Sequence, residues 1–96
     1  MSDEIRLERQ GAKGRYVITA PTGEEAELTW TGSGDDLRIL DHTGVPDVFR
    51  GQGIGLRLVT RAVEDARAGG FQLLPLCPFA AAQFDKHPEW ADVRRR

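Results

Sequence analysis

The stretch Arg50-Gly51-Gln52-Gly53-Ile54-Gly55 decides how this sequence is interpreted. Its three glycines stand directly before an amphipathic segment, residues 53–68, which we predict to be a helix that ends at Gly69-Gly70. The first turn of a helix has unpaired backbone N–H groups and a partial positive charge. Small residues there let an anion approach the backbone, so the pattern favours a phosphate site. The apolar face of the predicted helix consists of Leu56, Val59, Ala62, Val63 and Ala66.

The same turn has a simpler interpretation, and two known phosphate loops are excluded. The glycines could serve only a tight turn with positive φ angles. A P-loop requires Gly-Lys-Ser/Thr, whereas Gly55 is followed by Leu56-Arg57. A dinucleotide fold requires G-x-G-x-x-G after a strand that opens a βαβ unit, whereas the spacing here is G-x-G-x-G.

The residues before this turn predict an antiparallel meander. Four short segments are rich in β-branched and aromatic residues or alternate apolar with polar ones, and glycine- or proline-containing turns separate them. We expect strands at residues 5–7, 15–19, 25–30 and 37–42.

The residues after the helix predict a crossover. Residues 71–76 are almost continuously apolar, which indicates a strand covered on both faces and parallel to residues 37–42. A short helix over 79–86 should end at His87-Pro88. The fold class is therefore α/β (α+β), a mixed sheet with an N-terminal antiparallel meander, a βαβ crossover and a short C-terminal helix.

Composition limits the function classes. The 96 residues are predicted to form one domain, 1–96, with 40% hydrophobic residues and a net charge of −2, which gives no electrostatic reason to bind nucleic acid or an anionic membrane. The single cysteine excludes an intrachain disulfide. The acidic N-terminus does not resemble a signal peptide, and no apolar run would span a membrane. We expect a cytoplasmic monomer without a metal site.

Four motifs, taken together, carry a resemblance to a known family. They are His42-Thr43-Gly44-Val45, the glycine turn, Pro75-Leu76-Cys77-Pro78-Phe79 and His87-Pro88-Glu89. In this order, over residues 37–92, the chain resembles the minimal members of the GNAT N-acetyltransferase superfamily, which are about a hundred residues long.

The resemblance implies acetyl-CoA as co-substrate and an amine acceptor whose identity it leaves open. The pyrophosphate would lie on Arg50, Gly51, Gln52, Gly53, Ile54 and Gly55, and the pantetheine arm between strands 37–42 and 71–76, which splay apart. The amides of that arm need hydrogen-bond partners, which diverging strand edges offer. Val45 and Phe49 would flank the arm, and Phe79 and Lys86 complete the predicted cofactor-binding residues.

Cys77 and His42 are the predicted catalytic residues. Each stands near the end of one of two neighbouring strands, so we expect both to face the same cleft. Cys77 could be an acyl-accepting nucleophile, the wall of the acyl pocket or a buried packing residue, and we favour the wall. His42 could be a general base or a structural hydrogen-bonding residue.

The chain departs from the family pattern at Gln83, where the small relatives usually carry an aromatic residue, often tyrosine. The general acid is therefore open, because Tyr16 lies on the second predicted strand. We predict an acetyl-CoA-dependent N-acetyltransferase acting on a small molecule, peptide or protein. A non-catalytic acyl-CoA-binding module and a pure interaction domain are the alternatives. We expect Trp30 and Trp90 to pack, and the tail Arg94-Arg95-Arg96 to be solvated.

Overall fold

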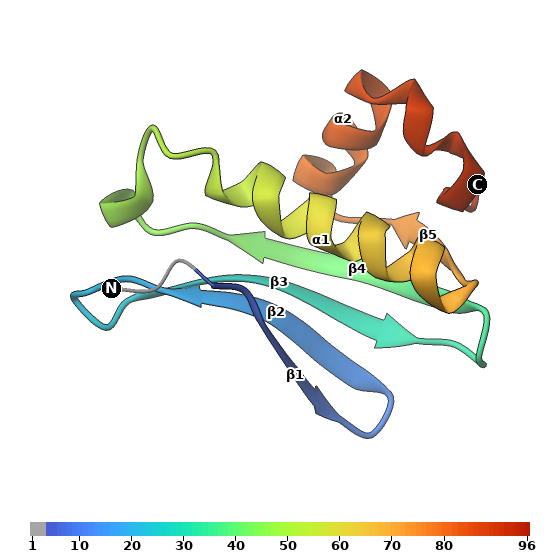
Figure 1. The fold of residues 1–96 in the computed structure, drawn as a ribbon, viewed down its shortest axis with the longest axis horizontal. Coiled ribbons are helices and arrows are strands. Elements are labelled where there is room, and N and C mark those ends of the chain that lie inside the picture. Colours follow the sequence, from blue (N-terminus) through green and yellow to red (C-terminus); the bar gives the residue numbers. More distant parts are fainter. Residues whose placement is uncertain (1–3) are drawn as a thin grey trace.

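A five-stranded sheet forms the centre of the part of the chain that the computed structural model describes, residues 4–96. Its strands follow one another in chain order, and Figure 1 shows them fanned out below the helices. The first four pair antiparallel and the last pair is parallel, as predicted. The strands are β1 (Arg6–Gln10), β2 (Lys13–Thr19), β3 (Glu25–Gly32), β4 (Leu37–Gly44) and β5 (Gln72–Pro75).

The helices cover one face of this sheet and leave the other open (Figure 1). They are η1 (Asp47–Phe49), α1 (Ile54–Gly69), α2 (Pro78–Lys86) and η2 (Pro88–Val93). In β3, residues Ala26, Leu28 and Trp30 alternate with polar residues and are buried beneath α1. This alternation is what a sheet with one covered face requires. No helix within residues 4–96 is long and apolar enough to cross a membrane.

The buried face of α1 differs at one position from the predicted one. Leu58 is fully buried, whereas Leu56 is 37% exposed in the first turn. The remaining predicted core positions of the helix are buried. Ile54 in the first turn is buried as well, so the apolar stripe runs through Ile54 and Leu58, and Leu56 lies beside it.

The outer edge of β5 is closed by the C-terminus of the chain. Leu73 forms a parallel bridge with Arg94, and the Arg95 N–H donates to the Leu73 carbonyl at 2.8 Å. The prediction that both faces of this strand are covered holds only in part, because Leu73 and Pro75 are buried on one face and Leu74 on the other is half-buried. In the strand order β5 lies at the edge of the sheet. The prediction of a solvated tail is wrong for Arg94 and Arg95, because their backbone protects an edge that would otherwise be open.

The strands β4 and β5 separate after a few residues. Their pairing ends at Leu40 and Pro75, while β4 continues to Gly44, beyond the predicted end at His42. A register shift against β3 leaves Asp41 as an extra residue, which is a β-bulge. Within the described chain, residues 41–44 therefore have β3 on one side and no strand on the other. The splayed strands predicted from the resemblance are present.

Candidate functional site

The glycine turn leads into an uncapped helix. Gly51 and Gly53 have φ angles of 79° and 65°, and within 4 Å of an added β-carbon at either position there is no other atom. Gly53 is the N-cap of α1, and among residues 4–96 no side chain hydrogen-bonds to cap this end. The first turn also has no acidic residue. The unpaired N–H groups and the positive end of the helix thus face open space, where an anion would complete them.

The third glycine has a different role from the other two. A β-carbon on Gly55 would lie 2.6 Å from Cζ of Phe79, so the ring of Phe79 packs directly on the glycine backbone. This contact ties the turn to the start of α2. Phe79 remains 38% exposed beside the turn, at the position predicted for a cofactor contact.

The segment between β4 and the turn exposes its valines and buries its phenylalanine. Val45 and Val48 are 41% and 37% exposed, whereas Phe49 is 5% exposed and belongs to the core. The predicted role of the Phe49 side chain as a cofactor contact is therefore corrected, since it anchors η1 and Val48 takes the outward position. Ile54 is likewise a core residue, which leaves its backbone N–H as the group it can offer.

Polar side chains at the turn are accessible. Arg50 forms an exposed ion pair with Asp47 at 3.4 Å, and Gln52 Nε2 donates to the Val48 carbonyl at 3.4 Å. Such an exposed pair is weak and a phosphate could replace the carboxylate. Lys86 lies at the opposite end of α2 from Phe79, so its contact with a phosphate stays a prediction.

Cys77 is the N-cap of α2 and is buried, with 5% of its surface exposed. Its sulfur lies 3.2 Å from the Thr43 hydroxyl. Burial raises the pKa of the Cys77 thiol, but hydrogen bonds from the Thr43 hydroxyl and from the backbone of Ala80, Phe79 and Thr43 outweigh it and hold the pKa below its ordinary value. The sulfur thus lies where β4 and β5 part, on the side of the sheet that the helices cover.

His42 lies on the other face of the sheet. It pairs with Thr29, whose side chain is on the open face, while the next residue, Thr43, pairs with the buried Leu28 and contacts Cys77. Successive residues of a strand point to opposite faces. His42 and Cys77, predicted to face the same cleft, therefore lie on opposite faces of the sheet. The bulge at Asp41 sets this orientation, and sequence alternation gives no signal for it.

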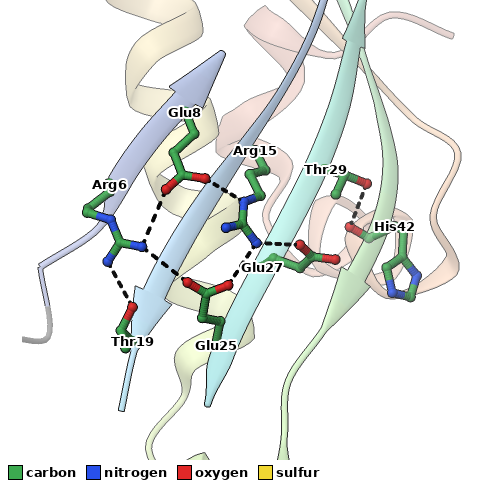
Figure 2. Close-up of polar contacts among 8 residues, drawn as sticks. All are labelled: Arg6, Glu8, Arg15, Thr19, Glu25, Glu27, Thr29 and His42. Atoms are coloured by element: carbon green, nitrogen blue, oxygen red, sulfur yellow. Dashed lines mark hydrogen bonds and ion pairs between the residues drawn. The ribbon is translucent and has the colours of Figure 1, made fainter. Parts of the chain in front are cut away.

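The open face next to His42 carries a network of ion pairs (Figure 2). Arg15 contacts Glu8, Glu25 and Glu27 at 2.7 to 3.1 Å, and Arg6 joins Glu8 and Glu25 at longer distances. These side chains come from β1, β2 and β3. None of them was predicted as a site residue, because charged residues at alternating positions also occur on any solvated strand.

Two residues bear on the missing general acid. Tyr16 is 1% exposed, its hydroxyl donates to Asp65 at 2.8 Å, and it accepts from Arg38 at 3.0 Å. Burial and the neighbouring carboxylate raise its pKa, so Tyr16 is a structural residue. The Gln83 carbonyl is 2.7 Å from Nδ1 of His87.

The closing motif is structural, as predicted. The His87 ring stacks on Trp90 with ring centroids 4.1 Å apart, and the His87 N–H bonds to the Phe84 carbonyl at the end of α2. Trp30 and Trp90 are both buried and pack in the core. Among the residues described, no group of three or more His, Cys, Asp or Glu side chains is placed to hold a metal.

Comparison with known proteins agrees with this geometry. The model of the GCN5-related N-acetyltransferase family matches residues 15–93, which include the meander, the glycine turn and both helices. The chain belongs to the GCN5-related N-acetyltransferase family. A solution structure of a GCN5-like protein from Staphylococcus aureus, whose N-acetyltransferase activity is provisionally assigned, is similar along almost the whole length. It is 29% identical with a TM-score of 0.73, and the match covers 99% of this chain and 91% of that one. No curated protein matches the chain significantly.

The sequence motifs found the turn, Cys77 and His42, but assigned no role to Thr43. Thr43 belongs to the motif His42-Thr43-Gly44-Val45, so the sequence did contain a signal for it. Only the register of β4 shows that Thr43, and not His42, is the neighbour of Cys77.

Proposed function

We propose that the protein is an acetyl-CoA-dependent N-acetyltransferase that transfers an acetyl group to an amine. The observation that carries this proposal is the alignment of two open features, the uncapped N-terminus of α1 and the gap between β4 and β5. The pyrophosphate would accept hydrogen bonds from the backbone N–H groups of residues 53–56, with Arg50 beside it. Val45, Val48 and Phe79 offer exposed apolar surface to the arm that follows.

The arm would lie along β4, where residues 41–44 have no strand on the outer side. Amides of pantetheine can pair with the backbone groups of this edge, as an added strand would. The thioester would then lie near Cys77 and Thr43. We propose that Cys77 forms the wall of the acyl pocket, because the residue is only 5% exposed and so offers little surface for attack on a carbonyl.

The transfer step needs a base and a proton for the leaving group. The amine nitrogen attacks the thioester carbonyl, the new C–N bond forms as the C–S bond breaks, and CoA leaves as a thiolate that takes a proton from solvent. We assign His42 as the base that removes the proton from the amine, since its imidazole is on the exposed face. The reaction at neutral pH requires such a base because alkylamines are protonated there.

A non-catalytic acyl-CoA-binding module is the second candidate. It is favoured by Gln83, which stands where a tyrosine could protonate the thiolate, and by Tyr16, which is buried in a hydrogen-bond network. Release of free CoA from acetyl-CoA, followed against a panel of amines and peptides, separates the two. Amine-dependent release supports the transferase, and tight binding without release supports the module.

The phosphate site is tested by the pair Gly53→Ala and Gly70→Ala. The two glycines flank α1, have φ angles of 65° and 74°, and have no atom within 4 Å of an added β-carbon. Both variants should lose about 1 kcal/mol of stability from the same backbone strain. Acetyl-CoA should raise the melting temperature of the wild type and of Gly70→Ala. It should raise the melting temperature of Gly53→Ala much less.

Pantetheine without the phosphates serves as the ligand control and should shift the melting temperature much less than acetyl-CoA. Equal ligand shifts in the two glycine variants would place the phosphate site elsewhere.

A further inference from the structure

A notch on the open face of the sheet adjoins the gap between β4 and β5. Gly44 and His42 are alternate residues of β4 and share this face, and Gly44 pairs with Glu27 of β3. A β-carbon on Gly44 would lie 3.2 Å from Nε2 of His42 and 4.0 Å from Cγ of Glu27. Because position 44 has no side chain, the imidazole edge and the carboxylate border the same open space.

The notch is anionic. One oxygen of Glu27, Oε1, accepts from Arg15 at 2.9 Å, and within residues 4–96 its other oxygen has no hydrogen bond. Arg15 is shared with Glu8 and Glu25, so it does not neutralise Glu27 alone. With Arg6, the network in Figure 2 contains two arginines and three glutamates, which gives a net charge of −1. A partly buried carboxylate of this kind attracts a cation.

The open face is also the side from which a second substrate can reach the gap. The helices cover the opposite face, where Thr43 and Cys77 lie. Thr29, which pairs with His42, borders a hollow of about 540 Å³ that Asp41, Arg15 and the edge of Trp30 also line, and the hollow thus begins next to the notch without including its three residues. The body of a small acceptor would fit such a volume.

We propose that Glu27, Gly44 and His42 form the acceptor subsite, which takes an unhindered primary alkylamine in its ammonium form. This proposal rests on the function proposed above. The Glu27 carboxylate binds the ammonium group, and Nε2 of His42 takes one proton from it. The neutral nitrogen then attacks the thioester through the gap beside Gly44, and its second proton is released to solvent as the C–S bond breaks.

The matched pair Glu27→Gln and Glu25→Gln tests the carboxylate. Both glutamates lie on β3, both contact Arg15, and their side chains are 31% and 38% exposed, but only Glu27 faces Gly44. With n-butylamine as acceptor, Glu27→Gln should raise the KM for the amine about tenfold, the loss of one charge-assisted hydrogen bond. The KM for acetyl-CoA should stay constant, and Glu25→Gln, which removes the same charge from the network but no group that faces Gly44, should raise the amine KM much less. Equal amine KM values in the two variants would overturn the proposal.

Gly44→Ala tests the open path to His42. The methyl group should lower kcat/KM for n-butylamine at least tenfold, because it stands between the amine and Nε2, while the thermal shift by acetyl-CoA is kept. A Gly44→Ala variant as active as wild type would contradict the notch.

Direct binding keeps this test separate from turnover. Addition of n-butylammonium chloride to labelled protein should shift the amide resonances of Thr29 and Gly44, and n-butanol should not. These shifts should persist in Glu25→Gln and vanish in Glu27→Gln. If they occur without any CoA release, the transferase proposal fails and the amine subsite stands. If CoA is released but these residues show no amine-specific shift, the amine subsite fails and the transferase proposal stands.

Discussion

Individual glycines in this chain have distinct physical tasks. Gly51 and Gly53 supply left-handed backbone where no atom crowds them, and Gly55 makes room for the ring of Phe79. Gly44 makes room for the imidazole of His42. The sequence shows the glycines of the turn as one motif, but only the side chains packed around each one separate a ligand-facing glycine from a packing glycine.

At the same scale, Thr43 contributes to the ionisation of Cys77. Its hydroxyl is one of the groups that lower the pKa of the thiol, so Thr43→Val should raise this pKa, and the thiolate should appear at higher pH than in wild type. A pH titration of the ultraviolet absorbance of the thiolate measures the midpoint.

The control for this titration is Thr60→Val, which removes a hydroxyl bonded to the Leu56 carbonyl on α1. It should leave the midpoint of Cys77 in place. Identical midpoints in both variants would show that the Thr43 hydroxyl does not lower the pKa of the Cys77 thiol.

At the scale of elements, periodicity predicted each strand and both α-helices, and the errors concern edges. The apolar run of residues 71–76 predicts a strand parallel to residues 37–42, but it does not show that β5 lies at the edge of the sheet. What covers its edge is the backbone of the tail, and backbone pairing leaves no trace in side-chain patterning. The bulge at Asp41 was missed for a related reason, because one inserted residue only interrupts an alternation that is already short.

The closing role of the tail predicts an effect of truncation. Removal of residues 94–96 should lower the free energy of unfolding by about 1–2 kcal/mol, since it deletes the backbone bond from Arg95 to Leu73 and the ion pair of Arg94 with Asp85. Denaturant unfolding measures this difference.

Removal of Arg96 alone is the matched control, because this residue is exposed. It should change stability by less than about 0.5 kcal/mol. Equal stability of the two truncated chains would show that the tail does not hold β5.

At the scale of the whole molecule, the sheet separates two chemical environments. Its helix-covered side holds the uncapped end of α1 and the Cys77 thiol, whose pKa is lowered, and its open side holds His42 and the ion pairs of Figure 2. The sequence motifs named the turn, Cys77 and His42, because turn and helix-cap chemistry is local. They did not show that His42 lies on the open side or that the ion pairs lie beside it, because this depends on the register of the strands, and Glu27 is far from every motif in the sequence.

The measurement that tests the central claim most directly is a map of backbone amide shifts in labelled protein as acetyl-CoA is added. We expect the largest shifts at residues 51–56 and 41–44, with little change at Gly70 and in the hairpin of β1 and β2, because the ligand would lie on the uncapped turn and in the gap beside β4. Shifts confined to other surfaces, or none at saturating acetyl-CoA, would contradict the account.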